Sequence, residues 1–271
     1  WIRTRKKLLV RGQSWEKILL WVRYGLFTHP VFGPVLIDTG YTQDSVNSKE
    51  RSLALRIYSN LLRPQLNQHE QPEAFLALFN LKPEDIRVVL ITHFHPDHIS
   101  GLRLFRNARF ITKGKAWQRI SSGFELQNVR HGIFRELIPE DFVDRMDALE
   151  TKPRVQPKRI ESSVFKEGWD VFNDNSLLAI PLPGHANGHF GLLFENLSKP
   201  LLYAVDTQWL LGALEEERGA SYITRTIVSA PKLVASTTNL VSRFKKYGGE
   251  VILCHDPNPT SFDLINSKAD L

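Results

Sequence analysis

Three histidines and an aspartate lie within six positions of this chain, in the run His-Phe-His-Pro-Asp-His over residues 93–98. Neutral imidazoles and a carboxylate that converge on one point are ligands for a divalent transition metal. A lone histidine is more often a surface residue or a hydrogen-bonded core residue. Four ligand-type residues at this spacing favour a metal site instead, and with it a metal-dependent enzyme.

The residues around this run indicate how it is positioned. Val88–Thr92 is apolar and β-branched and predicts a buried strand. His93 and His95 are two residues apart, so they project to one side of an extended backbone. Pro96 fits a turn that leaves the sheet, and we expect a helix over Ile99–Phe105. Asp97 and His98 would lie where that helix starts.

Three more ligand-type residues follow predicted strands. His185 comes after a run that ends in prolines and a glycine. Asp206 and His255 each directly follow an apolar run. Each has a plain alternative, as a helix cap, a turn aspartate or a core histidine. Together they predict ligands gathered at strand ends, as in open α/β folds. The strands expected here are Leu177–Leu182, Leu201–Val205 and Glu250–Cys254.

The composition is that of a globular protein, with 271 residues, 42% hydrophobic and 24% charged. We expect one domain over 1–271, with no apolar run long enough to span a bilayer. The only cysteine is Cys254, which excludes an intrachain disulfide and is compatible with a reducing compartment. We expect a cytoplasmic protein, although the chain starts at Trp1 and a leader segment is left open.

The net charge is +6, with basic residues clustered near the amino end and around residues 152–159. Such charge could attract anionic substrates, nucleic acid or a membrane surface. Outside these two clusters the basic residues are scattered and no nucleic-acid motif is evident, so we expect solvated faces and disfavour nucleic acid as a partner. A homodimer is left open.

Other elements are expected along the chain. Apolar spacing predicts a helix over Glu50–Leu62 with Leu53, Leu55, Ile57 and Leu61 near one buried face. The segment Ser121–Glu161 is harder to place, and we weigh a helical lid insertion against a surface excursion without a role. Further expected strands are Gly25–Thr28, Val35–Ile37, Arg109–Thr112 and Gly191–Glu195, and further expected helices are Gln71–Phe79, Lys115–Ile120 and Pro231–Tyr247.

Taken in order, these ligand-type residues resemble the metallo-β-lactamase superfamily from Leu36 to His255. The resemblance implies an α/β fold, the αββα sandwich, with two mixed sheets flanked by helices. It implies two divalent metal ions, zinc by default and iron, manganese or cobalt as alternatives. It assigns His93, His95 and His185 to one metal, Asp97, His98 and His255 to the other, and Asp206 to a bridge between them. Asp38 would orient ligands by hydrogen bonds.

The resemblance also implies a hydrolase. A hydroxide shared by the two metals would attack a small ester or lactone, and Asp97 or Asp206 would carry the proton. A cysteine-ligated subclass is disfavoured, because strand alternation would turn Cys254 to the face opposite His255. The flavodiiron branch is disfavoured because it has a glutamate where this chain has His95.

The segments from Asp38 and around His185 look similar to N-acyl-homoserine lactonase-like hydrolases, although glyoxalase II thioesterases share them. One departure is Trp209, where several lactonases have a tyrosine three residues after the bridging aspartate. Tyr222 or His131 could supply a polar group to the substrate pocket. We expect a hydrolase of a small ester or lactone, such as an acyl-homoserine lactone. The alternatives are a glyoxalase II-like thioesterase and a phosphodiesterase or ribonuclease that uses the basic surface.

Overall fold

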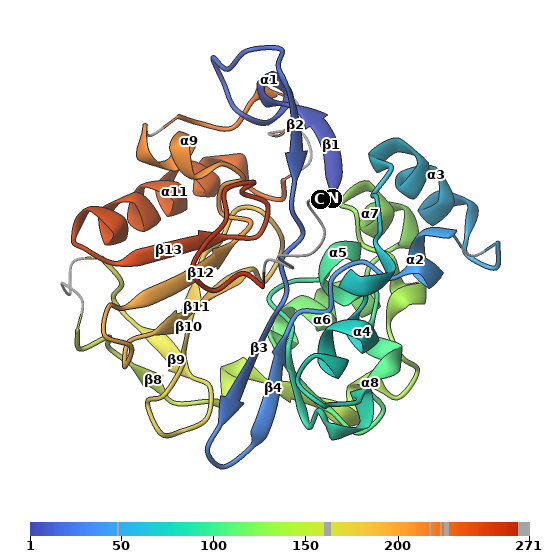
Figure 1. Ribbon diagram of the computed structural model, residues 1–271, viewed down its shortest axis with the longest axis horizontal. Coiled ribbons are helices and arrows are strands. Elements are labelled where there is room, and N and C mark those ends of the chain that lie inside the picture. Colours follow the sequence, from blue (N-terminus) through green and yellow to red (C-terminus); the bar gives the residue numbers. More distant parts are fainter. Residues whose placement is uncertain (48, 160–163, 217, 223, 225–227, 265–271) are drawn as a thin grey trace.

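Two β-sheets lie face to face, with helices on their outer sides (Figure 1). The computed structural model describes residues 1–47, 49–159, 164–216, 218–222, 224 and 228–264. The αββα sandwich expected from the sequence is therefore confirmed. Along the parts of the chain that are described, no helix is both long enough and apolar enough to cross a membrane.

The first sheet has five strands in the order β3-β4-β5-β6-β7, and all neighbours except the β3–β4 pair are parallel. Its parallel strands end at one edge, where Asp38 follows β4 and the histidine run follows β5. The bounds are β3 Gly25–His29, β4 Gly33–Ile37, β5 Val88–Leu90, β6 Arg109–Thr112 and β7 Met146–Ala148.

The second sheet has six strands in the order β13-β12-β11-β10-β9-β8, antiparallel except for the β12–β13 pair. Asp206 directly follows β12, and His255 lies two residues after β13. The bounds are β8 Arg154–Val155, β9 Gly168–Asp170, β10 Leu178–Pro181, β11 Phe190–Phe194, β12 Leu201–Val205 and β13 Glu250–Leu253.

Alternating side chains of the strands divide the core into layers, because successive residues of a strand face opposite sides. Val35, Ile37 and Leu90 pack against Leu192 and Tyr203 between the sheets. The intervening residues pack outward. On the first sheet they meet the helices of residues 43–145, and on the second they meet α11 and α9.

The helices cover the outer faces of both sheets (Figure 1). The α-helices are α2 Gln43–Asn47, α3 Leu53–Leu62, α4 Pro72–Ala77, α5 Pro96–Ile99, α6 Gly114–Ser122, α7 Glu125–Arg130, α8 Phe142–Arg145, α9 Leu211–Glu215 and α11 Pro231–Lys246. Short 3₁₀ turns are η1 Gln68–Glu70, η2 Pro83–Asp85, η3 Leu102–Leu104, η4 Arg135–Leu137 and η5 Leu149–Thr151. A separate hairpin at the amino end holds β1 Ile2–Arg5, α1 Lys6–Leu9 and β2 Lys17–Leu20.

Two sequence predictions about these elements were wrong. The face expected to be buried on α3 is largely exposed, with Leu53 at 69%, Ile57 at 50% and Leu61 at 79%, and only Leu55 enters the core. The helix packs through its other side, where Tyr58 meets Phe134 at a centroid distance of 5.1 Å.

The segment 121–161 is not a purely helical insertion. It contains α7, η4 and α8, but then β7 joins the five-stranded sheet and β8 joins the six-stranded sheet. The few residues of each strand carried too short a pattern to be recognised in the sequence. Residues 160 and 161 lie outside the described residues.

Candidate metal centre

The histidine run leaves β5 in an extended loop and enters α5 at Pro96. Proline suits the first turn of a helix, because its missing N–H would have no partner there. Asp97 and His98 therefore lie inside α5. The helix expected over Ile99–Phe105 was placed too late, and those residues form only the helix end and a 3₁₀ turn.

The loop that carries His185 is fastened to the start of α11. The backbone N–H of Ser229 donates to the His185 carbonyl at 3.0 Å, and that of Ala230 donates to the Gly184 carbonyl at 2.9 Å. Gly184 has φ +132°, and a Cβ there would lie 2.5 Å from the Val234 nitrogen. Only glycine allows this close approach, which fixes the position of His185.

Asp206 follows a distorted end of β12. The pairing with β13 shifts register between Tyr203 and Val205, and Val205 has φ +51°, which is rare for a β-branched residue. The Asp206 N–H donates to His189 Nε2 at 3.2 Å, while His189 Nδ1 donates to the Leu182 carbonyl at 2.7 Å. Residues in such conformations persist where surrounding contacts hold them, and they gather at functional sites.

Four side chains form a first group of potential ligands. His95 Nδ1 lies 3.0 Å from both His93 Nε2 and His185 Nε2, and His185 Nε2 lies 3.1 Å from Asp206 Oδ2. All four residues are buried. The atoms are close enough to one another to hold a single ion between them.

A second group shares the same carboxylate. His255 Nε2 lies 3.2 Å from Asp206 Oδ2 and 3.3 Å from Asp97 Oδ2. His98 Nε2 lies 3.6 Å from each of these two oxygens. Asp206 Oδ2 is therefore common to both groups. The structure thus brings together all seven residues that the sequence singled out.

The outer nitrogens of these imidazoles are bonded to acceptors. His95 Nε2 lies 3.0 Å from the His131 carbonyl, and His255 Nδ1 lies 2.7 Å from the Trp21 carbonyl. A carbonyl can only accept, so each of these nitrogens carries the hydrogen. In the neutral ring the other nitrogen then presents its lone pair to the centre, as a metal ligand requires.

Asp38 holds His98 in the same way. Its Oδ2 lies 2.8 Å from His98 Nδ1, and its Oδ1 accepts the Thr92 N–H at 2.9 Å. His98 Nε2 and Asp206 Oδ1 are buried without a hydrogen-bond partner among the described residues. Buried polar atoms in native structures normally have partners. A divalent cation would satisfy them, so the residues fit a two-metal site.

The pKa values of the histidines shift in opposite directions in the two groups. Burial lowers the pKa of His95 to about 3, assisted by His185, and it lowers the pKa of His93 well below the usual range. Burial also opposes the charged form of His98 and His255. The carboxylates beside them, chiefly Asp97 for His98 and Asp206 for His255, nevertheless raise their pKa well above the usual range.

The neighbouring histidines lower the pKa of the two carboxylates. Burial would raise the pKa of Asp97, but His98 and His255 outweigh it and lower the value to about 2. Burial acts likewise on Asp206, whose pKa falls well below the usual range because His255, His185 and His98 surround it. Both carboxylates are therefore ionised at neutral pH.

Cys254 does not point away from the site as strand alternation suggested. Its Sγ lies within 4.8 Å of the ligand atoms of His98, Asp206 and His255. The strand β13 ends at Leu253, so the period of two no longer applies at Cys254. The thiol is buried and donates weakly to the Arg23 carbonyl at 3.4 Å.

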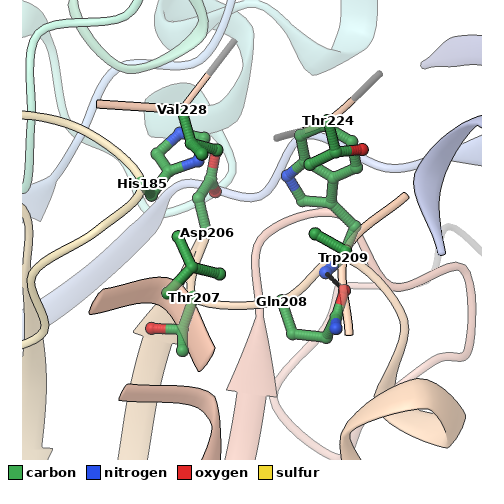
Figure 2. Close-up of a pocket in the computed structure, with 9 residues that line it drawn as sticks. His185, Asp206, Thr207, Gln208, Trp209, Thr224 and Val228 are labelled. Carbon is green, nitrogen blue, oxygen red and sulfur yellow. Dashed lines mark hydrogen bonds and ion pairs between the residues drawn. The ribbon is translucent and has the colours of Figure 1, made fainter. Parts of the chain in front are cut away.

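A small hollow opens beside His185 and Asp206 (Figure 2). Trp209 lines it, as expected, whereas Tyr222 does not and is 84% exposed. His131 meets the site through its backbone carbonyl, and its ring is not part of this lining. The rest of the lining is Thr207, Gln208, Ala220, Thr224, Val228 and Val234.

Some supporting contacts could not be recognised in the sequence. The carbonyls of His131 and Trp21 act through the backbone, which no side-chain pattern reveals. His189 was visible, four residues after His185, but its role in holding the Asp206 backbone depends on the bend after β12.

Comparison with known proteins gives consistent results. The family model described as "Metallo-beta-lactamase superfamily" matches residues 33–255. N-acyl homoserine lactonase AttM of Azorhizobium caulinodans is 24% identical over 242 residues, which span 88% of this chain and 82% of that protein. AttM of Agrobacterium fabrum is 26% identical over 242 residues, which likewise span 88% of this chain and 82% of that protein.

Solved structures show the same fold. A quorum-quenching N-acyl homoserine lactone lactonase superposes with a TM-score of 0.69 at 18% identity, covering 98% of this chain and 93% of that one. AidC, described as a dizinc quorum-quenching lactonase, superposes with a TM-score of 0.61 at 14% identity, covering 91% and 76%.

Proposed function

The chain belongs to the metallo-beta-lactamase superfamily of hydrolases, and we propose that it hydrolyses a small ester or lactone, foremost an N-acyl-homoserine lactone, with two bound divalent cations. The names of the AttM relatives support the lactone, and the description of AidC as a dizinc enzyme supports zinc. Iron, manganese and cobalt are the other metals that this donor set accepts.

The observation that carries the proposal is the shared carboxylate oxygen. Asp206 Oδ2 lies 3.1 Å from His185 Nε2 and 3.2 Å from His255 Nε2, so one oxygen belongs to both ligand groups. In our proposal His93, His95 and His185 would hold one cation, Asp97, His98 and His255 would hold the other, and Asp206 would be shared between the two. When bound, such a pair lowers the pKa of water and polarises the substrate carbonyl.

The protein's own residues orient and exchange protons around that centre. Asp38 and the carbonyls of His131 and Trp21 hold three imidazoles in one orientation. Asp97 is ionised at neutral pH, so it can accept a proton from the attacking water and pass it to the leaving oxygen. Asp206 is the other carboxylate placed to do so.

We also propose that the chain is a single domain and that part of 121–161 covers the site. The hydrogen bond from His95 Nε2 to the His131 carbonyl supports this, because it ties that segment to a proposed ligand. The strands β7 and β8 anchor the same segment in both sheets.

The test is hydrolysis of a panel of substrates by protein loaded with zinc, manganese or cobalt. We expect the lactone to be turned over fastest and chelated protein to be inactive. A preference for a thioester would indicate a glyoxalase II-like enzyme, and a preference for a phosphodiester would indicate a phosphodiesterase or ribonuclease. Activity on none of them would overturn the proposal.

A further inference from the structure

The side chain of Trp209 carries one polar atom, its indole nitrogen. This nitrogen, Nε1, is buried and has no hydrogen-bond partner among the described residues. The ring stands nearly perpendicular to two proposed ligands, at 6.4 Å and 78° from His185 and at 6.3 Å and 80° from His255. In Figure 2 the indole nitrogen lies on the edge of the ring that faces His185 and Asp206.

The ring is held in this place by its own loop. The Trp209 backbone N–H donates to Gln208 Oε1 at 2.8 Å, and Gln208 Nε2 donates to the Arg218 carbonyl at 3.2 Å. A buried donor without a partner costs roughly 1–3 kcal/mol. Such a cost is understandable where a bound molecule supplies the acceptor, and Trp209 is one of the residues that line the hollow beside Asp206.

The other side chains with donor groups in the lining already donate to backbone carbonyls: Thr207 to Ala204 at 2.8 Å, Gln208 to Arg218 at 3.2 Å and Thr224 to Leu9 at 3.0 Å. Tyr222 is 84% exposed and does not line the hollow. Tyr58 lies on α3 and is not part of the lining of the hollow. Among the described lining residues, Trp209 therefore offers a buried N–H that has no partner and lies beside the proposed ligands.

We propose that the Trp209 indole N–H donates a hydrogen bond to the acyl oxygen of the substrate as that oxygen gains negative charge. The inference rests on the proposed function and adds a catalytic residue to it. An indole N–H is a donor only and is not ionised in the catalytic pH range. Trp209 therefore stabilises charge on the acyl oxygen and leaves protonation of the leaving oxygen to the carboxylates.

The first test is Trp209→Phe, which keeps an aromatic ring and removes the N–H. We expect kcat to fall by about 100-fold, the effect of losing one donor to an oxyanion. The factor should be similar for a lactone and for a nitrophenyl ester, because both develop charge on the acyl oxygen. The pH profile should keep its shape, and Trp209→Tyr, which restores a donor, should lose less.

The second test does not depend on turnover. In zinc-loaded protein labelled with ¹⁵N, the product N-hexanoyl-L-homoserine should shift one of the six tryptophan indole resonances, the one missing in Trp209→Phe. Trp15→Phe is the matched control, because Trp15 is 55% exposed on the amino-terminal hairpin. It should behave as wild type in both tests.

The outcomes separate this inference from the proposed function. If wild type and Trp15→Phe both fail to hydrolyse lactones and esters, the proposed function is wrong. If wild type is active but Trp209→Phe keeps its kcat within about twofold, or no indole resonance moves, Trp209 is not the donor. If Trp209→Phe does not fold, the resonance is assigned from Trp209→Tyr, and the product titration of wild type decides.

Discussion

At the scale of single residues, contacts outside the candidate centre hold the proposed metal ligands in place. His95, His98 and His255 each bond an outer nitrogen to an oxygen of His131, Asp38 and Trp21 respectively. Such outer contacts fix the ring and typically change metal affinity by 10- to 100-fold when they are lost. The sequence singled out the proposed ligands by their residue type, whereas these hydrogen-bond partners became visible only with the fold.

The first residue-scale prediction concerns His95. His95→Ala should abolish lactone hydrolysis and remove at least one bound metal per chain, because His95 is central to the first ligand group. Metal content by atomic emission and turnover by pH-stat would measure both. His69→Ala is the control, because His69 is exposed. Retained metal and turnover in His95→Ala would exclude it as a ligand.

The second concerns pH. His98 and His255 have pKa values raised well above the usual 6.5, so without metal they are protonated at neutral pH, and binding must release these protons. Metal affinity should therefore rise with pH. His93 and His95 have lowered pKa values and are already neutral, so the first group should bind with little release.

Calorimetric titration of metal-free protein in buffers of different ionisation enthalpy would count the released protons. We expect more protons to be released when the second equivalent of metal binds than when the first one binds. Equal release for both equivalents, or affinity that falls as pH rises, would contradict these charge states.

At the scale of elements, the residues of the candidate site lie just after the ends of strands. The order of the strands and the proposed ligands could be predicted from the sequence, because apolar runs precede the proposed ligands and parallel strands end at one edge. The backbone conformation just after a strand could not be predicted. The register shift before Asp206 and the early end of β13 turn Asp206 and Cys254 in ways that alternation does not predict.

Gly184→Ala tests how the His185 loop is built. An added Cβ would lie 2.5 Å from the Val234 nitrogen, so the loop must move and weaken the first metal group. We expect destabilisation of about 1–3 kcal/mol in urea unfolding, together with at least tenfold lower turnover. Gly212→Ala in α9 meets nothing within 4 Å and should be neutral or slightly stabilising. Equal behaviour of the two variants would refute the packing argument.

Arg23 tests the segment that follows β13. Its guanidinium donates to the carbonyls of Leu253 at 3.0 Å and Asp256 at 2.6 Å, and it pairs with Asp263 at 2.8 Å. Arg23→Ala should cost about 3–5 kcal/mol of unfolding free energy, because it leaves buried acceptors and a charge unpaired. It should also weaken the second metal, since His255 lies in that segment.

Urea unfolding and metal content measure the Arg23 effect. Arg56→Ala, at an exposed arginine of α3, is the control and should stay within about 0.5 kcal/mol of wild type. An Arg23→Ala protein with wild-type stability and two metals would show that these contacts do not hold the segment.

At the scale of the whole molecule, the sandwich followed from the resemblance, and the strand pattern agreed with it. The sequence did not predict the amino-terminal hairpin of β1 and β2, whose strands hold four residues each. It also predicted a buried apolar face on α3 that the structure exposes, because helical spacing alone does not say which side meets a sheet.

The most direct test of the whole account is lactone hydrolysis measured against bound zinc per chain. Metal-free protein is titrated with zinc, and turnover of an N-acyl-homoserine lactone is followed at each addition. We predict that turnover rises until about two equivalents are bound, as the two ligand groups that share Asp206 require. Turnover that does not depend on zinc, manganese or cobalt, or a folded chain that binds none of them, would contradict the account.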